Sequence, residues 1–202
     1  MIETRRDPRR DGRRPALGGS GAARVVRPAR VADARPILEL LLETAALSPL
    51  ALLADLPDNH QALEAPLKAS AGDHLLVAVA EGQAGTGALD GVVFAVRGPG
   101  PMAHTANLSI AVAAAARRQG LASALLGAAA EWAAGHGVDR LTASVAGGNG
   151  PALALFGAAG FTLEGRRPGQ IRVSGDVDDE VLFGARVADL RARPGPARVV
   201  PL

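Results

Sequence analysis

The chain has no cysteine and no tyrosine among its 202 residues, and it has few other aromatic residues. The lack of cysteine excludes disulfides, thiolate metal sites and a cysteine nucleophile. The four histidines are scattered without the spacing of metal ligands, so we expect no metal site. Because alanine supplies much of the apolar content, we expect a core built from small side chains.

Lysine is also scarce, with Lys68 as the single example. With no tyrosine or cysteine either, almost nothing titrates between neutrality and the arginine range, so the high isoelectric point overstates the basicity. Residues 1–30 carry nine arginines against three acidic residues, a charge of +6, and the other 172 residues carry −4. Contact with nucleic acid is therefore expected only through this Arg-rich tail.

Long hydrophobic runs are missing as well. Interruptions by Gly, Glu and Arg leave no segment that could span a membrane, so we expect no membrane contact. Arg5 and Arg6 are not followed by a hydrophobic stretch, which argues against an export signal. A soluble protein of the cytoplasm is the expectation.

The sequence predicts one domain over residues 23–188. Residues 1–22 mix Arg, Asp, Gly and Pro without periodicity, which predicts a disordered tail. The Pro-rich residues 189–202 are predicted to be an arm or a disordered end.

Within the domain, periodicity predicts a strand at 23–27, a helix at 31–46 with Asp33 as its cap, and broken helices over 47–70. Two further helices are predicted at 120–135 and 151–159. Strands are predicted at 74–80, 91–97, 106–112, 140–145, 161–164 and 180–187. This order predicts an α+β fold in which helices flank a mixed sheet.

The most informative stretch joins the strand 106–112 to the helix 120–135. Gly120 and the small Ala122 open that helix, so the backbone can approach a bulky ligand. The N–H groups of the first turn point outward together and form an anion site. Arg117 and Arg118 add charge suited to a pyrophosphate or a ribose phosphate. An ordinary strand-to-helix turn has the same local pattern, and the stretch matches neither a P-loop nor a dinucleotide motif.

A second block runs from Asn149 to Phe161 and reads NGPALALFGAAGF. Together the two blocks resemble the GCN5-related N-acetyltransferase (GNAT) superfamily. The coenzyme A motif of that superfamily, R/Q-x-x-G-x-G/A, is matched at Arg117, Gly120 and Ala122. Its later pattern, N-x-x-A-x-x-L-Y-x-x-x-G-F, is matched at Asn149, Ala152, Leu155, Gly160 and Phe161. The resemblance covers about residues 24–188. It implies a GNAT fold, an α/β sandwich whose mainly antiparallel central sheet is splayed near the acyl-CoA site.

The resemblance implies transfer of an acetyl group from acetyl-CoA to a primary amine by direct attack. The backbone of 110–112 would pair with the pantetheine arm, and an amide near Val112 would stabilise the oxyanion. The implied cofactor-binding positions are Ile110, Ala111, Val112, Arg117, Arg118, Gln119, Gly120, Leu121, Ala122, Ser123, Asn149, Ala152 and Phe156. From the residues alone, Asn149 is equally the N-cap of the following helix.

Two positions depart from the family pattern. The residue after Leu155 is often a tyrosine that acts as general acid, and here it is Phe156. The strand 106–112 has no carboxylate where many members carry a glutamate base. The remaining base candidates are His104, a residue type suited to accept a proton near neutrality, and the acidic group Asp176, Asp178, Asp179 and Glu180. Asp179 resembles an aspartate that lies before the last strand in the GNAT subgroup acting on amino acids or protein N-termini, and it could attract a cationic amine. The residues alone also allow a structural interpretation, in which His104 is a surface histidine at the end of a strand and the acidic group forms a solvated turn.

The sequence leaves the acceptor open between an amino acid, a small amine and a protein N-terminus. It also leaves open whether the chain forms a homodimer. Residues 45–70 and 166–180 would shape the acceptor site, and their sequence does not identify the acceptor. The alternative function is a non-catalytic acyl-CoA-binding regulatory module, which the two departures keep open.

Overall fold

The computed structural model describes residues 25–47, 59–68, 75–81, 88–173, 175–190 and 198–199. The predicted tail 1–22, residues 82–87, most of the predicted C-terminal arm and parts of the predicted helical region 47–70 lie outside the described residues.

Four α-helices and five short 3-10 helices are described. The α-helices are α1 (Ala34–Leu47), α2 (Glu64–Lys68), α3 (Leu121–Gly135) and α4 (Gly150–Ala159). The 3-10 helices are η1 (Val31–Asp33), η2 (His60–Leu63), η3 (Gly100–Met102), η4 (Ala114–Ala116) and η5 (Val187–Asp189). The described strands are β1 (Val25–Pro28), β2 (Leu75–Glu81), β3 (Leu89–Arg97), β4 (Thr105–Val112), β5 (Arg140–Ala146), β6 (Thr162–Val173), β7 (Asp176–Arg186) and β8 (Arg198–Val199). The predicted order of elements is confirmed, and the last hairpin differs most from its predicted bounds.

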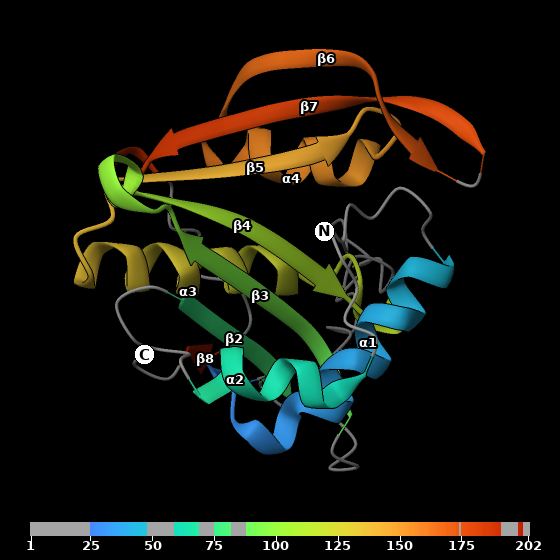
Figure 1. Cartoon of the computed structure of the whole chain (residues 1–202), viewed down its shortest axis with the longest axis vertical. Coiled ribbons are helices and arrows are strands. Elements are labelled where there is room, and N and C mark those ends of the chain that lie inside the picture. The colour runs from blue at the N-terminus through green and yellow to red at the C-terminus, as the bar shows by residue number, and fades with distance from the viewer. Residues whose placement is uncertain are drawn as a thin grey trace, which may run out of the picture.

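The described strands form one sheet in the order β6-β7-β5-β4-β3-β2-β1-β8 (Figure 1). The pairs β4–β5 and β1–β8 are parallel, and the remaining pairs are antiparallel. The predicted mixed, mainly antiparallel sheet is therefore confirmed. Because β4 and β5 are parallel neighbours, their carboxyl ends lie at one edge of the sheet. The N-termini of α3 and α4, which follow these strands, lie at that edge too.

Helices cover both faces of the sheet (Figure 1). On one face, α1 and α2 bury a cluster that includes Ile37, Leu40, Leu41, Leu63, Leu67, Val79, Val92 and Ala111. On the other face, α3 and α4 bury a larger cluster rich in alanine, with Val93, Ala106, Leu108 and Leu141 from the strands. Val92 and Val93 belong to different clusters, as the alternation of a strand requires. The predicted core of small side chains is confirmed.

Trp132 anchors α3 in the larger cluster. Its side chain is 1% exposed, and its ring stacks on His136 with 5.3 Å between the centroids. His136 Nδ1 lies 2.7 Å from the carbonyl oxygen of Trp132. Both side chains therefore pack α3 against the rest of the domain. His60 is exposed in η2, and His74 lies outside the described residues.

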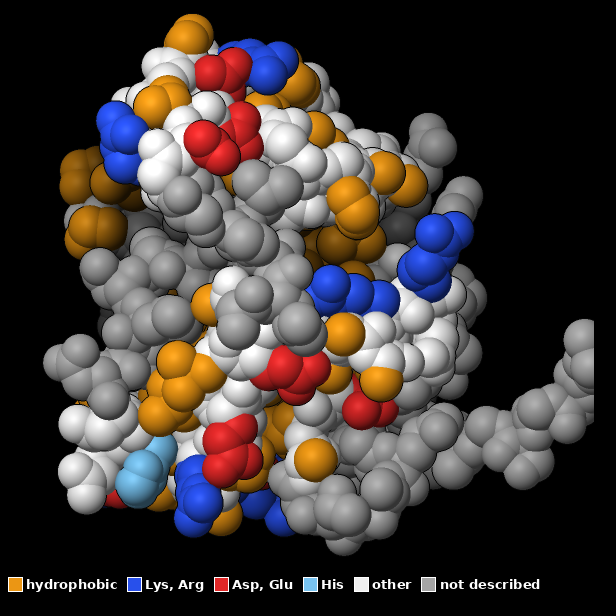
Figure 2. Space-filling model, turned by 90° about the vertical axis from the view of Figure 1, so that its right-hand side faces the viewer, with side chains coloured by type: hydrophobic (Ala, Val, Ile, Leu, Met, Phe, Trp, Pro, Cys, Tyr) orange, Lys and Arg blue, Asp and Glu red, His pale blue; other side chains and the backbone are white. Residues whose placement is uncertain are grey.

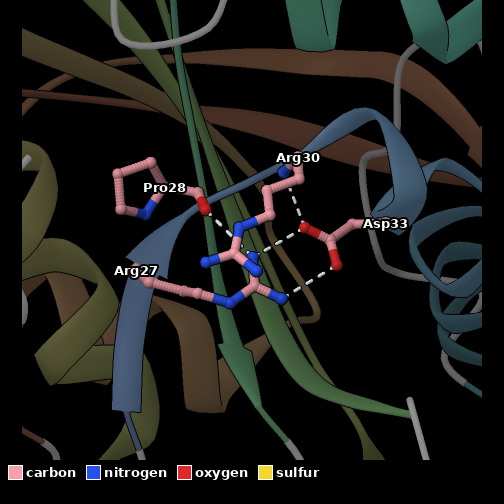
Figure 3. Close-up of polar contacts among 4 residues, drawn as sticks. All are labelled: Arg27, Pro28, Arg30 and Asp33. Carbon is pink, nitrogen blue, oxygen red and sulfur yellow. Dashed lines mark hydrogen bonds and ion pairs between the residues drawn. The ribbon is translucent and has the colours of Figure 1, made fainter.

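An ion pair fixes the junction between β1 and α1 (Figure 3). The Arg27 guanidinium donates to both oxygens of Asp33, at 2.7 and 2.9 Å, and the Arg30 amide donates to Asp33 Oδ2 at 2.6 Å. Burial alone raises the pKa of Asp33, but the hydrogen bonds and charges of the two arginines outweigh it and lower the pKa below its usual range. Asp33 thus caps the helical segment from inside its first turn.

The β6–β7 hairpin is longer than predicted, because strands were expected only at 161–164 and 180–187. Within β6 the register shifts between Arg167 and Ile171, and Gly169 has a φ of +63°. In the sequence, the step from Pro168 to Gly169 is typical of a loop that ends a strand. A proline is tolerated here because β6 is an edge strand. The predicted solvated turn is the hairpin tip, but Asp178, Asp179 and Glu180 lie within β7.

Among the described helices, none has both the length and the apolarity to cross a bilayer. Within the described ranges, no group of three His, Asp or Glu side chains is arranged to hold a metal ion.

Candidate active site

Strands β4 and β5 pair only over their first halves. The register begins with Thr105 opposite Arg140 and ends with Leu108 opposite Ala143. Beyond this point β4 continues along β3, and β5 continues along β7. Residues 109–112 and 144–146 therefore flank a break in the ladder, which we call the β4–β5 gap. The splayed sheet implied by the resemblance is present.

Two residues of β4 turn their peptide groups toward this gap. The Ala113 amide donates to Asp90 O on the β3 side at 2.9 Å. In an antiparallel ladder, alternate residues bond to the same neighbour, so Ala111 also bonds to β3. The N–H and C=O groups of Ile110 and Val112 then face the gap. Of the three predicted positions, Ala111 differs, because its backbone faces β3 and its side chain is buried in the α1 cluster.

The turn from β4 into α3 leaves the N-terminus of the helix uncapped. Arg118 and Gly120 have left-handed backbones, with φ of +59° and +78°. Gly120 is the N-cap and has no side chain to offer a hydrogen bond. The Ala124 amide donates to Gly120 O at 3.1 Å, so the amides of residues 121–123 precede the first intrahelical bond. These amides and the helix dipole form a site for an anion.

Basic side chains lie beside this helix terminus. Arg117 and Arg118 are both exposed, and Arg117 Nε donates to Val112 O at 3.1 Å. Gln119 Nε2 donates to Ala115 O at 2.9 Å. Figure 2 faces this end of the sheet and shows basic side chains next to a hollow with apolar side chains at its floor. Positive charge is therefore available at the open end of the β4–β5 gap.

The start of α4 forms the other side of the site. Asn149 Oδ1 accepts from the Ala152 amide at 3.2 Å, so its role as an N-cap is confirmed. Ala152 packs against the core, and Phe156 is only 5% exposed. The Phe156 ring contacts Phe161 edge-on at 5.1 Å and stacks on Phe183 at 5.7 Å between centroids. Phe156 is therefore mainly a core residue on the buried face of α4.

Asp179 lies in β7 beside the carboxyl end of β5, but its carboxylate is already engaged. It accepts from the Gly169 amide at 2.8 Å and from Arg166 Nε at 2.5 Å. These two hydrogen bonds, the first from Gly169, lower the pKa of Asp179 below its usual range. An ionised carboxylate with a lowered pKa is a weak base, and Arg166 offsets its attraction for a cation.

His104 lies at the opposite end of β4 from Val112. Its exposed ring has Nδ1 at 3.2 Å from the carbonyl oxygen of Pro101. The extended chain between His104 and Val112 spans about 26 Å at about 3.3 Å per residue. The structure therefore does not bring His104 together with the amides at the gap.

Sequence reasoning missed the role of Asp178. Its carboxylate holds the turn between β5 and α4 by a hydrogen bond from the Gly148 amide at 2.9 Å. The contact joins residues that are distant along the chain, and the only local signal was an acidic cluster next to glycines.

The splayed sheet and the uncapped helix terminus together form a site whose shape and charge suit an extended anionic ligand. The chain belongs to the acetyltransferase (GNAT) family, whose model matches residues 42–161, more than half of its length. It is therefore an acyltransferase. In sequence, no protein of curated function matches it.

Solved structures share this fold over most of the chain. A GNAT-family acetyltransferase from Streptococcus pneumoniae has a TM-score of 0.72 and 24% identity, over 80% of this chain and 97% of that one. A putative acetyltransferase from Salmonella typhimurium, solved with its cofactor acetyl-CoA, has a TM-score of 0.72 and 21% identity, over 87% of this chain and 98% of that one. A ribosomal-protein-alanine N-acetyltransferase from Brucella melitensis has a TM-score of 0.66 and 28% identity, over 80% and 98%. The GNAT fold is confirmed.

Proposed function

We propose that the protein binds acetyl-CoA in the β4–β5 gap and transfers its acetyl group to a primary amine by direct attack. The gap itself carries the proposal. It exposes the stretch of β4 beyond Leu108, which pairs with β3 but not with β5, and this stretch leads to the uncapped N-terminus of α3. A ligand with an amide-bearing arm and a phosphate end meets both requirements.

The residues along the site fit the successive parts of coenzyme A. The amide groups of a pantetheine arm can pair with Ile110 and Val112 as an added strand does. A pyrophosphate can then lie at the amides of residues 121–123, with Arg117 and Arg118 offsetting its charge. The related fold from Salmonella typhimurium holds acetyl-CoA, which supports the assignment.

The chain's own contribution to the reaction is positioning and charge stabilisation. When bound, acetyl-CoA supplies a thioester carbonyl that an amine can attack. The Val112 N–H faces the gap and would donate to the carbonyl oxygen as negative charge develops there. Holding the amine beside the thioester makes the attack effectively unimolecular. Direct attack needs no enzyme nucleophile, which is consistent with a sequence that has no cysteine.

The amine would approach from the sheet face that carries α1. On this face, a cavity of about 330 Å³ is lined by Asn107 from β4 and by Thr142 and Ser144 from β5. Their hydroxyl and amide groups can orient a polar acceptor. The cavity extends to Met102 and Thr105 at the η3 end of β4. The 28% identity with the Brucella melitensis ribosomal-protein-alanine N-acetyltransferase supports a protein N-terminus as one acceptor to test, beside amino acids and small amines.

The experiment combines binding and turnover. Coenzyme A binding is measured by calorimetry, and acetyl transfer is measured against amino acids, small amines and peptides with free N-termini. We expect binding and turnover of at least one acceptor class. Binding without turnover across the panel would favour the alternative, a non-catalytic acyl-CoA-binding module. Absence of binding would contradict both.

The missing tyrosine gives a separate prediction. An ordinary thiol has a pKa of about 8.5, so a thiolate can leave without an acid. We expect Phe156→Tyr to change kcat by less than about tenfold, below the usual range of general-acid effects. Phe161→Tyr adds a hydroxyl to the neighbouring ring and controls for changes in packing. A gain above about a hundredfold for Phe156→Tyr alone would show that the reaction lacks an acid.

A further inference from the structure

Both carboxylate oxygens of Asp178 are engaged at the carboxyl end of β5. Oδ2 accepts from the Gly148 amide at 2.9 Å, and Oδ1 accepts from the Asp179 amide at 2.7 Å. The second bond fixes the orientation of the carboxylate on β7. The first bond reaches the turn that leads from β5 into α4. Beside it, the Gly147 amide donates to the Asp179 carbonyl oxygen at 2.8 Å.

The turn is packed closely against this carboxylate. A Cβ atom placed on Gly147 would lie 3.0 Å from Asp178 Oδ1 and 3.2 Å from a terminal nitrogen of Arg166. These distances are tighter than ordinary contacts. The glycine thus allows the β7 side chains to seat directly on the backbone of the turn.

The position of Gly148 sets the start of α4. The Gly150 amide donates to Gly148 O at 3.0 Å, and the Asn149 amide donates to Ala146 O at 2.9 Å. The Asn149 side chain then caps α4 through Ala152. The hydrogen bond between Asp178 and Gly148 therefore holds the residue that directly precedes Asn149 and the start of α4.

We infer that Asp178 is a positioning residue for acyl-CoA binding, which acts through Gly148 to hold Asn149 and the N-terminus of α4 beside the β4–β5 gap. This inference rests on the proposed function. Asp178 touches the turn and not the ligand, so it governs the affinity for coenzyme A and leaves the chemical step intact.

The test compares wild type, Asp178→Ala and Asp178→Asn. The Kd for coenzyme A is measured by calorimetry, and the KM for acetyl-CoA and kcat are measured with an accepted amine. We expect Asp178→Ala to raise the Kd and the KM by about tenfold, the loss expected for a hydrogen bond to a charged group. The kcat at saturation should stay within about threefold. Asp178→Asn keeps one acceptor oxygen and should give an intermediate loss.

Asp139→Ala is the matched control, since it removes an exposed carboxylate at the other end of β5 and should leave the Kd unchanged. Thermal unfolding shows whether each variant is folded, and Asp178→Asn preserves the test if Asp178→Ala does not fold. A folded Asp178 variant that binds coenzyme A as tightly as wild type would overturn the inference. So would a fall in kcat at an unchanged Kd. If wild type itself does not bind coenzyme A, the proposed function fails instead.

Discussion

Replacing Gly120 with aspartate should abolish coenzyme A binding. Gly120 is the N-cap of α3 and has a φ of +78°, so a side chain there projects a charge at the proposed pyrophosphate site. Two like charges about 4 Å apart repel by about 4 kcal/mol near a protein surface. We therefore expect the Kd to rise by more than about a hundredfold, measured by calorimetry at low salt.

Gly120→Asn is the matched control for that variant. Asparagine has the same shape as aspartate and, like it, tolerates the left-handed backbone better than other residues do. The two variants thus differ in charge alone. Asparagine should weaken binding much less than aspartate, and the difference should shrink at high salt because ions screen the repulsion. Equal binding by the two variants would place the phosphates elsewhere.

The second large effect concerns stability. Asp33→Asn should lower the free energy of unfolding by about 3 kcal/mol, because Arg27 would lose the carboxylate that compensates its buried charge. The two side chains are only 13% and 10% exposed. For a domain of this size the melting temperature should fall by about 6–12 °C, measured by calorimetry or circular dichroism.

The Arg27–Asp33 pair also sets the direction in which the free energy of unfolding changes with pH. The pKa of Asp33 is lower in the folded protein, so its stabilisation is fully present above the ordinary value of about 3.9. That stabilisation is lost as the pH falls through the lowered value. The difference in stability between wild type and Asp33→Asn should thus hold at neutral pH and shrink below about pH 4. Glu39→Gln, which breaks the exposed Arg35–Glu39 pair, should cost less than about 1 kcal/mol. Equal losses from both variants would contradict this account.

Local patterns predicted most of the fold. The apolar periodicity of α1 and α3 and the alternation in β3 and β4 are set by near neighbours, so their bounds were close to those observed. The β6–β7 hairpin was predicted too short, because its pairs Arg167–Glu180 and Arg166–Asp179 join residues that are distant in sequence. No local pattern shows that a Pro-Gly step lies inside a strand.

The candidate site was predictable to the extent that it is local. The left-handed Gly120 and the amides after it follow from one short turn, and the Asn149 cap follows from the next. The β4–β5 gap depends on where two strands stop pairing, and only the family resemblance indicated it. His104 shows the limit of proximity in sequence, since it adjoins β4 yet lies at the end away from Val112.

The β4–β5 gap also divides the sheet into two sections. One section runs from β8 to β4 and the other from β5 to β6, and the pairs from Thr105 to Leu108 join them. The proposed acceptor cavity takes Asn107 from one section and Ser144 from the other. A ligand that lies along the gap would contact both sections, so its binding should restrict their motion relative to each other.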